Sequence, residues 1–230
     1  MASVYPLDMT NSEVSFEQLN TILSQPEADR GLEWENRFLS AFYKAKIEIV
    51  DESVQTGPDS WPYLFVKSSP QAGEPVEKVC QWLSGKGVGL ALNTHKMLPD
   101  YVFTYGMVWD AVQRGGFDQR QPAEDKPAKD MTLSNGQELF VGVPSDTYLP
   151  NGPRKILREF FQHQGVKEPK VLLVSRDQEH YDLCFSAESL GLTNEKETEG
   201  VLEAISWFLP NSYQLAMVSE KMIPHPFQSL

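Results

Sequence analysis

The sequence predicts an α+β fold built from two mixed or antiparallel sheets with helices packed on them. Runs typical of strands are interspersed with segments whose apolar residues recur at helical spacing. With 40% hydrophobic and 23% charged residues, the composition is that of an ordinary globular protein. Residues 118–130 are rich in charge, contain two prolines and lack a large apolar side chain. We therefore predict an N-terminal domain over residues 1–117, a linker or long loop over 118–131, and a C-terminal domain over 132–230.

In the first half, the spacing of apolar residues and the residues that end each run predict the helices and strands. Ser15 predicts the N-cap of a first helix, with Gln18 at the capping-box position and Pro26 as its end. A second helix is expected over residues 31–44, and a third opens at Pro75 and ends at Gly85. Alternating or wholly apolar runs predict strands at residues 47–51, 63–66, 88–92 and 101–105, and residues 107–112 predict a last helical turn or two.

The second half has the more regular pattern. Strands are expected at residues 138–143, 171–174, 181–185 and 213–217, and helices at residues 151–165 and from Thr193 or Asn194 to Pro210. The resulting order is strand, helix, strand, strand, helix, strand. This is the order of a ferredoxin-like, split βαβ unit. No repeat of 20–50 residues is visible, and we expect both halves to carry helices on one face of a sheet.

The net charge and the hydrophobicity of the chain limit the classes of molecule that it is expected to bind. The formal net charge of −12 disfavours nucleic acid and anionic lipid, and it suits a basic protein partner. No stretch of about twenty apolar residues predicts a membrane span. The first residues lack the basic start and apolar run of a signal peptide, so we expect a cytoplasmic protein.

The sequence assigns no catalytic, cofactor-binding or metal-binding residue. The four histidines are not spaced as metal ligands. Cys80 and Cys184 lie in apolar patterns and are predicted to be buried thiols. The glycines of residues 85–89 follow a predicted helix and enter a strand, the reverse of a phosphate-binding loop.

One aromatic segment has two interpretations. Tyr101, Phe103 and Tyr105 share one face if residues 101–105 form a strand, and Trp109 follows closely. If this face points inward, it is the core of the first half. If it points outward, Tyr101, Phe103, Tyr105 and Trp109 are candidates for a surface that binds a protein or peptide.

Residues 137–230 resemble the C-terminal domain of the SseB family, bacterial proteins of enhanced serine sensitivity. The resemblance is carried by the segments Leu139–Pro144, Tyr148–Pro150, Arg154–His163, Val171–Val174 and Pro226–Phe227. The first half, through Phe38–Tyr43 and Ile47–Ile49, is compatible with the family's N-terminal domain. The resemblance implies a two-part α+β protein of the bacterial cytoplasm, and it supplies no catalytic residues.

Three functions follow from these observations. The first is a non-enzymatic interaction or regulatory protein with a protein partner. The second is a small-molecule-binding protein or enzyme with its site between the halves, where His95, Asp100, Tyr105 and His180 are candidate polar groups. The third is an immunity-type or chaperone-type binder of a basic protein, which the acidic charge would attract. The oligomeric state is not predicted.

Overall fold

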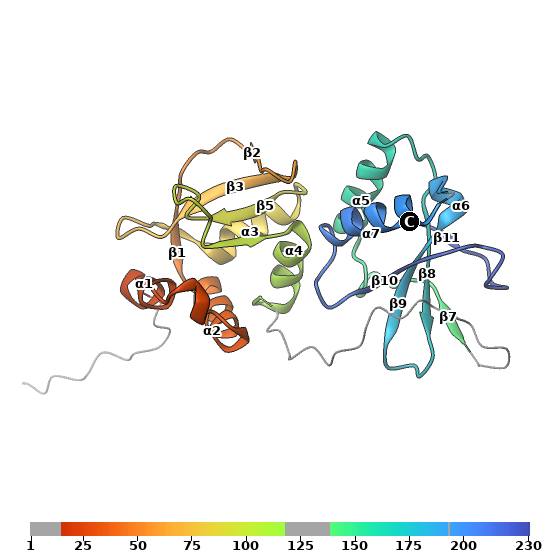
Figure 1. Ribbon diagram of the computed structural model, residues 1–230, viewed down its shortest axis with the longest axis horizontal. Helices are drawn as coiled ribbons and strands as arrows, with labels where there is room; N and C mark the ends of the chain where they lie inside the picture. Colours follow the sequence, from red (N-terminus) through yellow and green to blue (C-terminus); the bar gives the residue numbers. More distant parts are fainter. Residues whose placement is uncertain (1–14, 118–138, 193) are drawn as a thin grey trace, which may run out of the picture.

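The computed structural model describes residues 15–117, 139–192 and 194–230, and it has an α+β fold with helices packed on two mixed sheets (Figure 1). The predicted linker over 118–131 lies outside the described residues. So do residues 132–138, at the start of the second half, and Thr193, one of the two predicted helix caps.

The first half contains a six-stranded sheet in the order β4-β1-β3-β5-β6, with β2 paired to β3. Its strands are β1 (Lys46–Ile49), β2 (Gln55–Thr56), β3 (Pro62–Lys67), β4 (Glu74–Pro75), β5 (Gly89–Leu92) and β6 (Tyr101–Phe103). Its helices are α1 (Phe16–Leu23), a 3-10 turn η1 (Glu27–Asp29), α2 (Leu32–Tyr43), α3 (Val76–Ser84) and α4 (Tyr105–Arg114).

The second half contains a five-stranded sheet in the order β10-β9-β8-β11, with β7 also paired to β8. Its strands are β7 (Phe140–Gly142), β8 (Lys170–Ser175), β9 (Tyr181–Ser186), β10 (Gln214–Val218) and β11 (Gln228–Ser229). Its helices are α5 (Asn151–His163), α6 (Ala187–Leu190) and α7 (Glu195–Ser206).

The predicted element order of the second half is confirmed, with α6 and β11 in addition. The order of the strands within the sheet differs from the ferredoxin-like prediction. In a split βαβ unit another strand separates the two parallel strands. Here β9 and β10, which flank α7, pair directly and in parallel, with Leu215 opposite Leu183. The sheet is therefore sequential rather than interleaved, and the ferredoxin-like arrangement does not form.

The two halves repeat one topological unit. In the first half α2 precedes the antiparallel pair β1–β3, and α3 leads to β5, which is parallel to β3. In the second half α5 precedes the antiparallel pair β8–β9, and α7 leads to β10, which is parallel to β9. An edge strand, β4 or β7, pairs antiparallel with the first strand of each unit. The two halves thus share a common order and direction of strands, a closer likeness than the helices on one face of a sheet that the sequence suggested.

Each sheet has one face packed under helices, and its other face is covered at least in part. In β3, Leu64 and Val66 join the core under α1, α2 and α3, whereas Tyr63 points to the opposite face and packs with residues of the second half. In the second sheet, Leu173 and Leu183 belong to this same shared core, beneath α5 and α7. The far face of the second sheet is covered by the C-terminal segment through Ile223 and Phe227.

The halves meet through aromatic side chains and backbone. Trp61 stacks on Trp207 with ring centroids 4.7 Å apart, and the Trp207 indole donates to the Tyr63 hydroxyl at 2.9 Å. The buried Trp109 indole donates to the Phe208 carbonyl at 2.8 Å. Because these groups are buried and hydrogen-bonded across the junction, the halves pack as parts of one interior.

The strand predicted at residues 101–105 is too long. It ends at Phe103, because the Thr104 hydroxyl accepts a hydrogen bond from the Met107 amide and caps α4. The helix then runs for ten residues to Arg114, longer than the turn or two expected, and Gly115 ends it in the left-handed conformation.

Candidate functional site

The aromatic segment proposed as a binding surface is interior. Phe103 and Tyr105 are fully buried, and Trp109 is nearly so. Tyr101 and Phe103 pack into the core of the first half, whereas Tyr105 and Trp109 pack at the junction of the halves. Since α4 begins at Tyr105, the four side chains do not share one face. The inward interpretation holds, and these residues do not form an exposed surface for a separate partner.

The four polar candidates for a site between the halves are also dispersed. Tyr105 is buried and donates its hydroxyl to the Ser84 carbonyl at 2.7 Å. His95 is exposed on the loop between β5 and β6, and Asp100 ends that loop within the first half. Only His180 lines a cleft at the junction. The structure therefore does not bring this set together.

That junction cleft has a volume of about 460 Å³. Its walls come from the end of α4, the β7–α5 loop, the β8–β9 turn and the start of β10; they include Arg114, Tyr148, His180 and Tyr213. Arg114 is bonded to Asp110 at 2.9 Å, and His180 to Asp177 at 2.7 Å. The stacked rings of Tyr148 and Tyr213 are held by a hydrogen bond from the Tyr213 hydroxyl to the Tyr148 carbonyl.

The two cysteines are unsuited to nucleophilic chemistry. Both are fully buried, and burial raises the pKa of each thiol to about 12. A reactive cysteine needs a thiolate, which such a pKa suppresses at neutral pH. Within the described ranges, no group of three His, Cys, Asp or Glu side chains is arranged to hold a metal ion. Among these residues, no helix is both long and apolar enough to cross a membrane.

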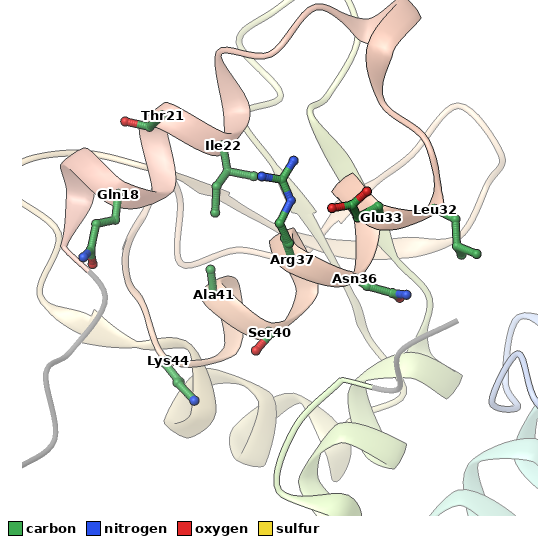
Figure 2. Close-up of a pocket in the computed structure, with 10 residues that line it drawn as sticks. All are labelled: Gln18, Thr21, Ile22, Leu32, Glu33, Asn36, Arg37, Ser40, Ala41 and Lys44. Carbon is green, nitrogen blue, oxygen red and sulfur yellow. The ribbon is translucent and has the colours of Figure 1, made fainter. Parts of the chain in front are cut away.

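The larger open hollow lies along α1 and α2. It has a volume of about 990 Å³ and is lined by side chains of both helices (Figure 2). We call it the α1–α2 groove; its lining residues are Gln18, Thr21, Ile22, Leu32, Glu33, Asn36, Arg37, Ser40, Ala41 and Lys44. The two helices lie at the lower left of Figure 1, whereas α4 lies on the side of the first half that faces α5 and α7. The groove is thus separate from the packing of the halves.

The sequence of α2 explains why one of its faces is left for the groove. Trp34, Phe38 and Phe42 recur at helical spacing, are buried and stack on one another in the core. Leu39 is buried with them, whereas Arg37 is exposed and Ser40 and Ala41 are partly exposed. Arg37 and Ala41 lie one turn apart, and in Figure 2 both point toward Ile22 of α1. The groove is therefore the outer surface of an amphipathic helix, walled on one side by α1.

Hydrogen bonds fix α1 against α2. The Trp34 indole donates to the Ile22 carbonyl at 2.8 Å, and Arg30 donates to the Leu23 carbonyl at 2.6 Å. Arg37 donates to the Gln25 side chain at 3.3 Å. Ser15 and Gln18 form the predicted capping box at the start of α1. These contacts join the C-terminal end of α1 to α2 and to the segment before it, and the capping box closes the first turn of α1.

The groove is locally positive in an acidic protein. Its lining contains two cations, Arg37 and Lys44, and one carboxylate, Glu33, whereas the whole chain carries −12. Arg37 stands near the middle of α2 and Lys44 is its C-cap residue. The remaining lining groups are amides, hydroxyls and the apolar side chains Ile22, Leu32 and Ala41. This mixture suits contact with a segment that is partly apolar and partly acidic.

The sequence predicts α2 as an amphipathic surface helix with Glu and Arg residues on its outer side, and it predicts no groove. The missing information is the position of α1, which turns a convex helix surface into a concave one. No family model matches this chain, no curated protein matches it, and no solved structure matches it.

Proposed function

We propose that this chain is a non-enzymatic interaction or regulatory protein that binds a protein partner through the α1–α2 groove. The observation that carries the proposal is the groove itself: an open, partly apolar hollow with two cations, on an otherwise acidic molecule. A cytoplasmic location and kinship with the SseB family belong to the same proposal. They are supported by the sequence patterns described above.

The dimensions favour a helical segment as the bound element. The groove follows α2, whose twelve residues span roughly 18 Å at 1.5 Å per residue. An amphipathic helix of similar length can place apolar side chains against Ile22, Leu32 and Ala41. Carboxylates on its flanks would face Arg37 and Lys44. The partner segment is therefore acidic and amphipathic, in contrast to the basic partner that the net charge of the chain suggests.

Binding is favoured over catalysis by the chemistry of the lining. Its ionisable groups are Glu33, Arg37 and Lys44, and its hydroxyls are those of Thr21 and Ser40. The Thr21 hydroxyl donates to the Glu17 carbonyl at 2.7 Å, and Arg37 donates to the Gln25 side chain at 3.3 Å, so neither is bonded to a catalytic base in these contacts. Shape and charge complementarity are what such a surface can supply.

Affinity capture with charge-reversed variants tests the proposal. The bait is the tagged full chain, either unchanged or carrying Arg37→Glu and Lys44→Glu. A matched control carries Lys155→Glu, an exposed cation of α5 in the second half. We expect one protein to be recovered near stoichiometry with the unchanged and control baits and to be lost with the groove variant.

The alternatives give different results. A basic partner, as an immunity-type or chaperone-type binder would have, should be retained or bound more tightly by the groove variant, because that variant is more acidic. Equal capture by the groove and control variants, or no specific capture by any bait, would refute the groove proposal. Circular dichroism of each bait before use excludes unfolding as the cause of a loss.

A further inference from the structure

The cleft at the junction of the halves is lined by polar side chains. Each of its ten lining residues carries a hydrogen-bonding group, and no aliphatic side chain is among them. Six of these groups are hydroxyls, those of Ser145, Thr147, Tyr148, Tyr181, Ser212 and Tyr213. Small-molecule sites often form where two parts of a chain meet, but most are lined mainly by apolar side chains. The junction cleft therefore has the position of such a site and suits a ligand with many polar groups.

Three of the six hydroxyls are available to a ligand. The Tyr213 hydroxyl is used within the protein, because it donates to the Tyr148 carbonyl. Within the described part of the chain, the hydroxyls of Thr147, Tyr148 and Ser212 make no hydrogen bond to another residue. Tyr148 is half-buried, and burial raises the pKa of its hydroxyl. A polar group that loses water without gaining a protein partner costs free energy, which a hydrogen bond from a ligand would offset.

The charges around the cleft favour an uncharged ligand. Arg114 is paired with Asp110 at 2.9 Å, and His180 is bonded to Asp177 at 2.7 Å. Glu179 adds a carboxylate to the lining, and the whole chain carries −12. A phosphate or another anion would meet these carboxylates at short range, whereas a neutral molecule would not be repelled.

Tyrosine rings supply an apolar surface within the cleft. Tyr148 and Tyr213 are stacked with ring centroids 4.4 Å apart, and Trp109 packs edge-on against Tyr213 at 6.2 Å. These contacts fix the rings in place. A sugar ring has C–H groups that pack on an aromatic surface, and hydroxyls around its edge that both donate and accept hydrogen bonds. The hydroxyls of the cleft can do the same.

We propose that the junction cleft binds an uncharged, polyhydroxylated molecule of the size of a mono- or disaccharide. Its volume of about 460 Å³ lies within the usual range of small-molecule sites, roughly 300–1,000 Å³. Arg114 belongs to the first half, whereas Tyr148, His180 and Ser212 belong to the second, so the ligand contacts both halves. This site is separate from the α1–α2 groove and does not depend on the protein partner proposed there.

Saturation-transfer difference NMR with a panel of neutral sugars tests the proposal. The probes are glucose, galactose, mannose, N-acetylglucosamine, maltose and trehalose, each titrated into the unchanged full chain and three variants. Ser212→Trp fills the cleft, Tyr148→Phe removes one hydroxyl and keeps the ring, and Ser206→Trp is the matched control at an exposed position of α7.

We expect at least one sugar to bind the unchanged chain and the Ser206→Trp control equally well. Ser212→Trp should abolish this binding, and Tyr148→Phe should weaken it about 3- to 10-fold, which corresponds to the loss of one hydrogen bond. The unfolding midpoints of the four forms should agree, so that unfolding is not the cause of a loss.

The proposal is overturned if no sugar of the panel binds, or if binding persists unchanged in either cleft variant. Binding of inorganic phosphate without binding of any sugar would assign the cleft to an anion and overturn it as well. The groove variant, Arg37→Glu with Lys44→Glu, should bind sugar normally. The sugar titration and the capture of a protein partner therefore succeed or fail independently.

Discussion

Gly106 lies directly against the backbone of Leu209. A Cβ atom on Gly106 would stand 1.9 Å from the Leu209 carbonyl oxygen, and the Gly106 amide donates to the Trp207 carbonyl at 3.0 Å. These two residues belong to different halves of the chain. Their contact brings α4 of the first half and the turn after α7 so close that only glycine fits between them.

Replacing Gly106 by alanine should therefore separate or strain the junction. The clash is with backbone atoms, which cannot rotate away, so we expect a loss of about 3 kcal/mol or more in the free energy of unfolding. Urea denaturation followed by circular dichroism measures it. Gly116→Ala is the matched control, because a Cβ there meets nothing within 4 Å. Equal stability of the two variants would show that this contact does not form.

Removing the Trp109 indole donor should also weaken the junction. Trp109→Phe leaves the Phe208 carbonyl without its partner at 2.8 Å in a buried site. An unsatisfied buried acceptor costs about 1–3 kcal/mol. The same change at the half-exposed Trp82 should alter the free energy of unfolding by no more than about 0.5 kcal/mol. A loss at Trp82 as large as that at Trp109 would contradict the assignment.

Asp100 should contribute stability that disappears in acid. Burial raises the pKa of this carboxyl, but hydrogen bonds from Lys96 and Asn93 outweigh it and hold the pKa below 3.8. The folded state thus binds its proton less readily than the unfolded chain. The contribution is present above about pH 4 and is lost as pH falls through the lower, folded pKa.

Asp100→Asn tests this prediction. At pH 7 the variant should be less stable by about 1–3 kcal/mol, the range for hydrogen bonds to charged groups. The difference from the unchanged protein should shrink when urea denaturation is repeated below pH 4. A difference that stays constant with pH would exclude an ionised Asp100 as its source.

The thiols of Cys80 and Cys184 should be unreactive in the folded protein. With the pKa of each thiol near 12, the thiolate is scarce at pH 8, and both sulfur atoms are buried. We expect Ellman's reagent to detect no thiol in the native state and both thiols in guanidinium chloride. Because the folded pKa is the higher one, these groups also lower stability as pH rises from about 9. Rapid native labelling would show that one of the sulfur atoms is accessible.

Local patterns predicted most of the elements, and long-range packing explains where they failed. The capping box at Ser15 and the end of α3 at Gly85 depend only on residues close in sequence, and the structure confirms both. The segment 101–105 alternates like a strand, yet the single hydroxyl of Thr104 ends the strand and starts α4. The sequential order of the second sheet depends on strand pairing between distant residues, which periodicity does not encode.

The candidate site was harder to predict for the same reason. Arg37 and Lys44 could be assigned to the outside of α2, but the groove also requires α1 beside it. The exposure of Met97 and Leu98, on a loop whose base is held by ion pairs of Asp100, is likewise visible only in the structure. Tyr105 and Trp109, which the sequence offered as candidates for a binding surface, pack instead in the core shared by the two halves.

In the proposed complex, the α1–α2 groove holds an acidic, amphipathic segment of a protein partner. The most direct measurement is photo-cross-linking in host cells with p-benzoylphenylalanine placed at Ser40 in the groove and, as a control, at Glu203, an exposed residue of α7. We predict one covalent adduct from position 40 and none from position 203, with mass spectrometry mapping the adduct to an acidic, amphipathic peptide. No adduct from position 40, or the same adducts from both positions, would contradict the claim.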